Sequence, residues 1–376
     1  MTGLYIYIHD FRSSGVVRDT LTYARLLAER FPTTVVAAYG TGFFRAEAER
    51  APFRLVVLNE RQGRHSRFAA IPGLRRWLRA QRPGLLLSMG VLGHPTIFLA
   101  CQGLSHVARI YRISNEVAGP VKKDSALRRF WIRRLMHDAA RLILVGTAMG
   151  RHDLFADAVR RGHAVTIPSG VDRRQALELS QADAPHPWLE DDIPIVVAIG
   201  RLRPQKNLEL LIGAVEIARR SRRLRLIIIG GGTSAEQARM HALAAGFSAD
   251  FLLAGETDNV FAWLSRADVF ALPSRWEGSS LALLEAMAVG TPVVASRLAG
   301  DAADVLEDGR YGVLFEGQDI DALAAALLRQ ISDRRVMPED RAFFYDTGRI
   351  ADLYATTIAG ALAERADEVA DRAAAL

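Results

Sequence analysis

Short runs of consecutive apolar residues recur along the whole chain, and a longer, helix-like stretch separates each run from the next. Strands that are buried on both faces carry unbroken runs of this kind, whereas half-exposed strands alternate apolar and polar residues. Repeated strand–helix units form parallel, doubly wound sheets. The sequence therefore predicts an α/β fold with two doubly wound, parallel-sheet (Rossmann-like) domains. The expected strands are Leu4–Ile8, Thr34–Ala38, Arg54–Leu58, Gly84–Met89, His106–Ile113, Leu142–Val145, Val165–Ile167, Ile195–Ile199, Leu224–Ile229, Asp250–Leu253, Val269–Leu272 and Pro292–Ala295.

A predicted linker, residues 179–194, separates the two domains. It contains several prolines and the acidic cluster from Glu190 to Asp192, a composition that interrupts the strand–helix pattern. We therefore expect a first domain over residues 1–178 and a second over residues 195–345. Ligands bind outside the carboxyl ends of parallel strands, so a ligand is expected in a central crevice that both domains face.

Basic residues are concentrated in the first half of the chain. Residues 1–175 hold 28 Lys and Arg against 12 Asp and Glu, whereas residues 176–376 hold 20 against 30, and the whole chain carries a net charge of +6. Such an asymmetry predicts that the first domain meets an anionic partner.

The remaining composition favours a cytoplasmic protein. No run approaches the roughly 18–20 apolar residues of a membrane span. The strand-like start of the chain has no basic region before it, which argues against a signal peptide. Cys101 is the only cysteine, so an internal disulfide is excluded, and its apolar surroundings favour a small core residue.

The most informative segment, residues 272–295, has the pattern strand, loop, helix, turn and strand. Its helix begins near Ser279 or Ser280, either of which can serve as an N-cap, and the free N–H groups there suit an anion. Glu277 precedes the helix and can accept hydrogen bonds from sugar hydroxyls, and Glu285 can reach a second polyol such as a ribose. Alternatively, Glu277 is a helix-start carboxylate favoured by the macrodipole and Glu285 a solvated residue.

A second segment places two cations after the first strand of the second domain. Arg201 and Lys206 suit a diphosphate, since a guanidinium clamps phosphate oxygens and an ammonium adds a point charge. They would also stabilise the charge of a departing diphosphate. Asn207 is predicted to cap the following helix. Two solvated loop cations are the alternative.

Two glycine-containing turns carry weaker signals. Gly15 lies between the first strand and a helix, where backbone can approach a phosphate or a sugar. Gly230–Gly232 also follows a strand but lacks the G-x-G-x-x-G spacing, so dinucleotide binding is not predicted.

Taken together, these segments resemble glycosyltransferase family 4, a large group of retaining transferases with the GT-B fold. The resemblance rests on Ser14–Arg18, Ile167–Asp172, Gly200–Asn207 and Glu277–Glu285. It implies a first domain that binds the acceptor, a second that binds a nucleoside-diphosphate sugar, and C-terminal helices (346–376) that cross back to the first domain.

The resemblance also implies a role for each candidate residue. Arg201 and Lys206 would hold the donor diphosphate. Glu277 would bind hydroxyls of the transferred sugar, and Glu285 the ribose. With Glu277, the two cations form the expected catalytic set. The other expected contacts are Ser279, Ser280 and Leu281 at phosphate or sugar, Gly255 in the stretch that flanks the base, and Gly15 near the donor.

The chain departs from the family pattern at two places. Many members have Gly-Phe-Gly after the first Glu, where this chain has Gly278-Ser279-Ser280, so the choice of sugar is not readable. Many members also carry a His near the reacting carbon, where this chain reads Arg112 to Glu116, so that Asn115 or Glu116 would serve there.

Two stretches, residues 74–79 and 127–135, combine arginines with tryptophan. In the second, Leu127, Trp131 and Leu135 share one helical face with arginines beside it, as in a helix that lies on an anionic membrane. A core-facing stripe with a solvated basic face is the alternative. No nucleic-acid motif accompanies the charge, so a nucleic-acid partner is not expected.

The sequence thus predicts a retaining hexosyltransferase. It would move a sugar from a UDP- or GDP-sugar to a hydroxyl of a glycan or lipid-linked acceptor, in cell-surface polysaccharide or glycolipid assembly. No cofactor and no metal are expected, because the two cations take that role at the phosphates. The expected location is the cytoplasm, with a peripheral position on the cytoplasmic face of the inner membrane. A nucleotide-sugar epimerase and a non-catalytic nucleotide-sugar-binding protein are the alternatives.

Overall fold

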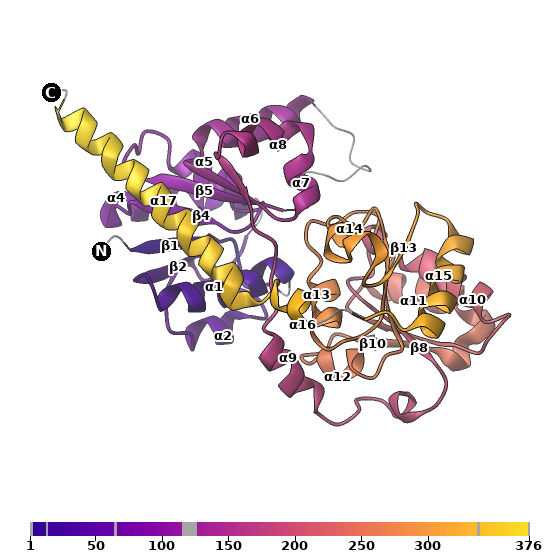
Figure 1. Ribbon diagram of the computed structural model, residues 1–376. Helices are drawn as coiled ribbons and strands as arrows, with labels where there is room; N and C mark the ends of the chain where they lie inside the picture. Colours follow the sequence, from indigo (N-terminus) through magenta and orange to yellow (C-terminus); the bar gives the residue numbers. More distant parts are fainter. Residues whose placement is uncertain (1–2, 13, 64–65, 115–125, 337–338, 375–376) are drawn as a thin grey trace. The chain divides into compact units, whose positions relative to one another are not determined.

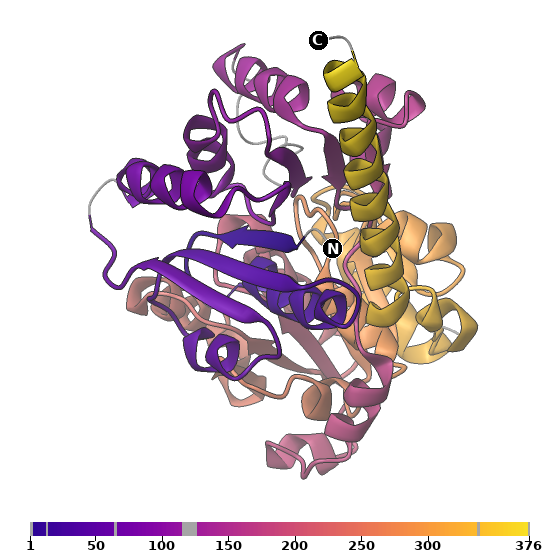
Figure 2. The same ribbon diagram turned by 90° about the vertical axis from the view of Figure 1, so that its left-hand side faces the viewer.

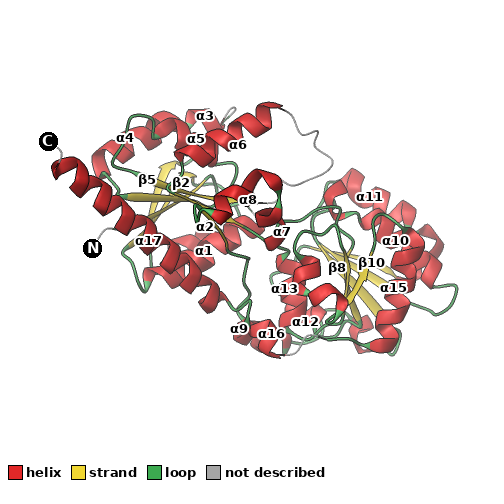
Figure 3. Cartoon of the chain, turned by 45° about the horizontal axis from the view of Figure 1, so that its top comes forward, coloured by secondary structure: helices red, strands yellow, loops and turns green. Residues whose placement is uncertain are grey.

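The protein consists of two compact α/β units. The computed structural model describes residues 3–12, 14–63, 66–114, 126–336 and 339–374. Unit 1 comprises residues 1–168 and 347–376, and unit 2 comprises residues 169–346. In each unit the strands form an inner layer with helices on both sides (Figure 3). The predicted fold class, two parallel-sheet α/β domains, is confirmed.

The boundary between the units differs from the predicted linker. Residues 179–194 belong to unit 2, where α9 (Arg173–Ser180) and the 3-10 helix η2 (Pro187–Glu190) contribute to the core. The prolines interrupt the strand–helix pattern because Pro187 starts η2, a position where its missing N–H costs nothing. The acidic cluster is also used, since Asp191 forms an ion pair with Arg225.

Among the described residues, unit 1 has a seven-stranded sheet in the order β3-β2-β1-β4-β5-β6-β7, and all of its neighbouring strands are parallel. Successive residues of β1 point to opposite faces, so Ile6 enters one core and Tyr7 the other. The strands are β1 (Leu4–Ile8), β2 (Thr33–Tyr39), β3 (Arg54–Asn59), β4 (Leu85–Ser88), β5 (Ala108–Ile113), β6 (Arg141–Leu144) and β7 (Ala164–Thr166).

Helices cover both faces of this sheet. One face packs against α1 (Gly15–Ala28), α2 (Arg45–Glu49) and the long C-terminal helix α17 (Thr347–Ala374), which lies beside α1 (Figures 1 and 2). The other face packs against α4 (Ile71–Gln81), α5 (His94–Ala100), α6 (Ala126–Asp138), α7 (Thr147–Arg151) and α8 (Asp153–Arg160). A short helix, α3 (Ser66–Ala69), precedes α4.

Unit 2 has a six-stranded parallel sheet over its described residues, in the order β10-β9-β8-β11-β12-β13. The edge strand β13 was not predicted, because a three-residue apolar run is too short to show a period. Glycines on both sides of it, Gly312 and Gly317, were the available signal. The strands are β8 (Ile195–Ile199), β9 (Arg225–Ile229), β10 (Phe251–Gly255), β11 (Val269–Leu272), β12 (Val293–Ser296) and β13 (Val313–Phe315).

The helices of unit 2 also divide between two cores. One core contains residues of α9, α12 (Phe261–Leu264), α13 (Leu281–Ala288) and α14 (Ala302–Val305), and the other contains residues of α10 (Leu208–Ala218), α11 (Ser234–Leu243) and α15 (Ile320–Asp333). The remaining short elements are α16 (Glu339–Phe343) and the 3-10 helices η3 (Pro204–Lys206), η4 (Ala245–Asp250) and η5 (Glu307–Gly309).

A buried polar network fixes α17 onto unit 1. Arg112 of β5 is fully buried, pairs with Asp19 of α1, and donates through Nε to the Tyr354 hydroxyl of α17 at 2.8 Å. The Tyr354 ring stacks on Tyr23 of α1 with 4.8 Å between ring centroids. A buried guanidinium requires such partners, because leaving it uncompensated costs several kcal/mol.

We expect Arg112→Met to destabilise unit 1 by about 3–5 kcal/mol, because Asp19 would stay buried without its cation. The control is Arg30→Met, which removes an exposed ion pair between Arg30 and Asp352 of the same helix α17 and should cost at most about 1 kcal/mol. Urea unfolding followed by circular dichroism measures both. Equal costs for the two variants would contradict a special role for the buried network.

Candidate functional site

The two most informative segments of the sequence lie side by side in unit 2. The loop after β8 carries Lys206, and the loop after β11 carries Glu277; these strands are neighbours in the sheet. The Arg275 N–H donates to the Gln205 carbonyl at 2.9 Å, and the Gln205 side chain donates to the Trp276 carbonyl at 3.0 Å. Parallel strands bring their carboxyl ends to one edge of the sheet, which explains why segments 71 positions apart in the sequence meet.

A partly buried ion pair lies at the centre of this contact. The Lys206 Nζ is 2.6 Å from Glu277 Oε1, which also accepts from the Ser274 hydroxyl at 2.8 Å. The other carboxylate oxygen accepts from the Gln205 side-chain amide at 3.2 Å. Because only 8% of Glu277 is exposed and side chains satisfy both of its oxygens, it is more than a solvated helix-start carboxylate.

Gly200, at the end of β8, makes room for the lysine. A Cβ atom there would lie 2.8 Å from Cε of Lys206, and the residue has a φ of +156°. Gly200 thus lets the aliphatic stem of Lys206 cross the backbone closely on its way to Glu277.

Asn207 stands at the predicted start of α10, but the predicted cap is wrong. The residue has a left-handed conformation, with φ of 53°, and its side chain makes no capping hydrogen bond. Instead, its amide donates to the Pro273 carbonyl at 3.2 Å and to Gln318 Oε1 at 2.9 Å, and its oxygen accepts from Arg275 Nε at 3.2 Å. Asn207 therefore links loops from three strand ends, a role that a sequence pattern does not reveal.

Arg201 lies in the same loop as Lys206, and its side chain is exposed. Among the described residues, no ion-pair partner of Arg201 is found. An exposed guanidinium beside the Lys206–Glu277 pair is available to an anion from solution.

The start of α13 has the geometry expected from the sequence. Ser280 is the N-cap, and its hydroxyl accepts from the Leu283 N–H at 3.4 Å. Ser279 is half-buried, and its hydroxyl accepts from the Ser169 N–H at 3.4 Å. Leu281 is the first helical residue, so its N–H is one of the free donors of the helix start. Glu285 is 5% exposed, which excludes the interpretation that it is a solvated residue.

Asp301, which the sequence did not single out, lies behind this loop. It follows Gly300, whose backbone packs against the Glu277 and Gly278 carbonyls, such that a Cβ there would be 2.6 Å from the Glu277 oxygen. Asp301 is 2% exposed, and the Ser279 hydroxyl hydrogen-bonds to its carboxyl group. Burial, with smaller contributions from the nearby carboxylates of Asp304 and Glu277, raises the pKa of Asp301 to about 7 in spite of the hydrogen bond from Ser279.

The two predicted glycines of the site lie at different places. Gly255 ends β10 with a φ of +75°, and its carbonyl accepts from the Gly230 N–H at 2.7 Å. Gly15, in unit 1, is exposed and begins α1, where the Ser14 hydroxyl accepts from the Val17 N–H at 3.3 Å. Asn115 and Glu116 lie outside the described residues.

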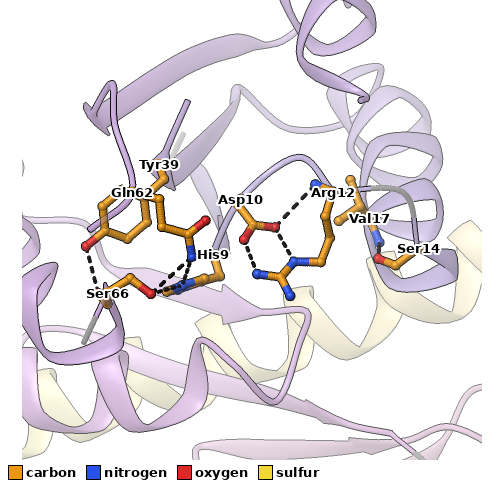
Figure 4. Close-up of polar contacts among 8 residues, drawn as sticks. All are labelled: His9, Asp10, Arg12, Ser14, Val17, Tyr39, Gln62 and Ser66. Atoms are coloured by element: carbon orange, nitrogen blue, oxygen red, sulfur yellow. Dashed lines mark hydrogen bonds and ion pairs between the residues drawn. The ribbon is translucent and has the colours of Figure 1, made fainter. Parts of the chain in front are cut away.

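Unit 1 has a polar cluster of its own at the carboxyl edge of its sheet (Figure 4). His9 follows β1, Tyr39 ends β2, and Gln62 and Ser66 follow β3. Ser66 connects the cluster: its hydroxyl hydrogen-bonds to His9 Nε2 at 3.2 Å and accepts from the Gln62 amide at 3.1 Å, and its carbonyl accepts from the Tyr39 hydroxyl at 2.7 Å. Such side chains can exchange hydrogen bonds with a polyol.

Asp10 and Arg12 lie next to this cluster (Figure 4). Arg12 donates through Nε to Asp10 at 2.7 Å and also pairs through its terminal nitrogen. Burial alone would raise the pKa of Asp10, but the hydrogen bonds from Arg12 hold it below its usual value. The group is therefore an anion at neutral pH.

The two stretches that combine arginines with tryptophan face the core of unit 1. In α6, Ile132 and Leu135 are buried, and Trp131 packs edge-on against Phe98 with 5.7 Å between centroids. In α4, Leu74 and Leu78 are buried, and Trp77 packs on Tyr5. The interpretation of these apolar faces as membrane-binding is therefore wrong, because both are used in packing. The side chain of Leu127 lies outside the described residues.

The exposed basic face of α6 remains available. Arg133 and Arg134 are exposed, as is Phe130, over whose ring Arg134 lies at 5.9 Å. No described helix is both long enough and apolar enough to span a bilayer. Within the described part of the chain, no group of three His, Cys, Asp or Glu residues is arranged to hold a metal ion.

Residues 193–333 match the family model described as "Glycosyl transferases group 1". This range runs from just before β8 into α15. It thus contains Arg201, Lys206, Glu277, Glu285 and Asp301.

Curated relatives match part of the chain. A GDP-mannose-dependent alpha-(1-6)-phosphatidylinositol monomannoside mannosyltransferase from Mycolicibacterium smegmatis is 36% identical over 154 residues, which cover 38% of this chain and 40% of the relative. The lipopolysaccharide core biosynthesis mannosyltransferase LpcC from Rhizobium leguminosarum is 29% identical over 228 residues, which cover 54% of this chain and 64% of LpcC. The chain thus spans about half the length of the curated relatives that it matches.

Solved structures match nearly the whole chain. HepE from Anabaena, in complex with UDP and glucose, superimposes with a TM-score of 0.78 and 18% identity over 96% of this chain and 100% of HepE. A sucrose-phosphate synthase from Thermosynechococcus elongatus gives a TM-score of 0.74 at 19% identity, again over 96% of this chain and 100% of the synthase. At such low identity the likeness concerns the fold, and it confirms the GT-B architecture.

A double-mutant cycle tests the ion pair at the centre of unit 2. We expect Lys206→Met to cost about 1–3 kcal/mol, because Glu277 keeps only neutral donors, and Glu277→Gln to cost less. If the two side chains interact, the sum of the two single-variant costs differs from the cost of the double variant by about 1 kcal/mol or more. Urea unfolding measures all three.

The same cycle on Arg334 and Asp268, a more exposed ion pair of unit 2, is the control and should give a coupling of less than about 1 kcal/mol. Additive costs for Lys206 and Glu277 would show that the two side chains do not interact in solution.

Proposed function

We propose that this chain, whose residues 193–333 match the family model of the group 1 glycosyltransferases, transfers a hexose-type sugar from a nucleoside diphosphate to a hydroxyl of a glycan or lipid-linked acceptor. The observation that carries the proposal is the contact between the loops of Lys206 and Glu277. In this contact a cation, which suits phosphate, lies 2.6 Å from a carboxylate, which suits sugar hydroxyls.

The ion pair does not have to break when the donor binds. An ammonium group has three N–H donors, and the contact with Glu277 leaves others for phosphate oxygens. Arg201, exposed in the same loop, provides a second cation that clamps the diphosphate. Glu277 in turn retains acceptor capacity for the hydroxyls of the transferred sugar, because each carboxylate oxygen has two lone pairs.

The other contacts of the donor follow from the helix start. The N–H groups of Ser279, Ser280 and Leu281 bind phosphate or sugar, since a helix N-terminus favours anions. Glu285 binds the ribose, and backbone near Gly255 flanks the base. Arg201 and Lys206 neutralise the departing diphosphate, and no metal is required for that charge.

The transfer retains the anomeric configuration. The acceptor oxygen attacks the anomeric carbon on the face from which the diphosphate leaves, so the bond from carbon to the phosphate oxygen breaks as the bond to the acceptor oxygen forms. The acceptor's proton passes to the departing phosphate oxygen. Lys206 and Arg201 lower the energy of this step by stabilising the charge on that oxygen.

The donor is a UDP- or GDP-sugar, and the acceptor is built into a cell-surface polysaccharide or glycolipid. Two relatives are mannosyltransferases by name, one of them GDP-mannose-dependent, and a structural neighbour holds UDP and glucose. In unit 1, the cluster of His9, Tyr39, Gln62 and Ser66 offers donors and acceptors to a polyol, and we assign it to the acceptor hydroxyls.

A thermal-shift panel of UDP-, GDP- and ADP-sugars tests the donor site. The cognate donor should raise Tm with the logarithm of its concentration. Arg201→Ala should lower the affinity for that donor by about tenfold or more, because a hydrogen bond to a charged group is lost. Arg203→Ala is the matched control from the same loop, since Arg203 pairs with Glu236, and its donor affinity should stay unchanged.

Product analysis tests the reaction itself. Glu277→Gln should lower transfer by about tenfold to a hundredfold while the protein remains folded. NMR of the product should show the anomeric configuration of the donor. Conversion of the sugar without an acceptor would indicate an epimerase, and a donor that binds but is neither transferred nor hydrolysed would indicate a binding protein.

We also propose that the protein is cytoplasmic and binds the anionic surface of the inner membrane through the basic face of α6. Arg133→Glu with Arg134→Glu should release it from vesicles that contain phosphatidylglycerol, measured by co-sedimentation at low salt. The matched control, Arg220→Glu with Arg222→Glu, changes two exposed arginines of unit 2 by the same charge. Equal binding of both variants, or no binding by the wild type, would contradict the proposal.

A further inference from the structure

Asp301 lies at the carboxyl end of a third strand of unit 2. Lys206 follows β8, Glu277 follows β11, and Asp301 follows β12, and these three strands are consecutive in the sheet. Gly300 brings the backbone before Asp301 against the Glu277 and Gly278 carbonyls. Asp301 is therefore held behind the loop to which the proposed function assigns the sugar and phosphate contacts.

The surroundings of Asp301 are unusual for a carboxyl group. Its Oδ1 atom is buried and has no hydrogen-bond partner within the part of the chain that the structure describes. The Ser279 hydroxyl is the side chain that hydrogen-bonds to the group. A buried carboxylate oxygen without a donor is costly, and the cost is smaller when the carboxyl group is protonated and therefore neutral.

The charges that face Asp301 also favour the neutral form. Glu277 in the loop after β11 and Asp304 in α14 are both acidic. Tyr345, after α16, is a neutral neighbour, because burial raises the pKa of its hydroxyl to about 12. Arg341, a cation beside Tyr345, donates to the Tyr345 hydroxyl and to the Asp304 and Val305 carbonyls.

We propose that Asp301 is a positioning residue of the donor site, which in its protonated form holds Ser279 and keeps a second negative charge away from Glu277. The inference rests on the proposed function, because it concerns the same loop. The site thus binds a nucleoside diphosphate when Asp301 is neutral. When Asp301 ionises, its charge repels the diphosphate, and the hydrogen bond to Ser279 changes its direction.

The pH dependence has a definite sign. The pKa of Asp301 is raised from 3.8 to about 7, so the neutral form dominates below neutral pH. If only that form binds well, the affinity falls above pH 7 by about tenfold for each pH unit. Asp301→Asn keeps the shape of the side chain and cannot ionise, so its affinity should not fall in this way.

Isothermal titration with UDP and with GDP, from pH 6 to pH 8.5, tests the proposal. Wild type should lose about tenfold or more in affinity across this range, and Asp301→Asn should lose much less. The nucleotide's own ionisation affects both proteins alike and cancels in the comparison. In the transfer assay the variant should change the pH dependence of KM and leave kcat nearly constant.

A second measurement follows Asp301 without any ligand. A native state that holds the proton more tightly than the unfolded chain loses stability as pH rises between the two pKa values. The Tm of wild type relative to Asp301→Asn should therefore fall from about pH 4 to pH 7 and then become level. A constant difference would show that Asp301 is already ionised and would overturn the proposal.

The outcomes separate the two hypotheses. If neither UDP nor GDP binds at any pH, the proposed function is contradicted, and the positioning role of Asp301 is contradicted with it. Binding that falls equally in wild type and Asp301→Asn removes only the role of Asp301. Binding that is insensitive to pH in both proteins also contradicts it.

Discussion

Glu277 is a largely buried carboxylate that needs a cation, and this requirement organises the loops at the carboxyl edge of the unit 2 sheet. Glu277 is 8% exposed, and its burial is tolerable because Lys206, Ser274 and Gln205 supply donors to both of its oxygens. These donors come from two loops, so satisfying one carboxylate also fixes the loop of one strand against that of its neighbour. The same contact leaves a cation and a carboxylate side by side at the carboxyl ends of two neighbouring strands.

Unit 1 uses a similar constraint for a different purpose. Arg112 is buried between α1 and α17, where Asp19 and the Tyr354 hydroxyl satisfy it. Its partners are far away in the sequence, so a network of this kind leaves no local pattern. The sequence resemblance implies that the segment from Arg112 to Glu116 lies near the reacting carbon. In the structure, Arg112 holds the C-terminal helix α17 onto unit 1 through Tyr354.

The fold was predictable because its signals are local. Largely apolar runs marked every described strand except β13, whose three residues are too few. The helix start at Ser280 followed from cap chemistry. The predictions that were wrong concerned the direction in which particular side chains point. The Asn207 side chain points to neighbouring loops instead of its own helix, and the tryptophans of α4 and α6 pack into the core. A pattern gives the position of a residue along an element, but tertiary packing decides which partner it meets.

Asp301 illustrates why the protonation state of a site residue could not be predicted from the sequence. An aspartate in a loop is ordinarily an anion, and nothing adjacent to it in the chain suggests otherwise. Its proton affinity arises from burial and from two acidic neighbours, one of which, Glu277, is brought near by the packing of Gly300 on the preceding loop. The same packing gives Ser279 a partner, because its hydroxyl hydrogen-bonds to the Asp301 carboxyl and an apolar side chain there could not. The hydrogen bond between Ser279 and Asp301 therefore joins two loops, a coupling that neither loop sequence shows by itself.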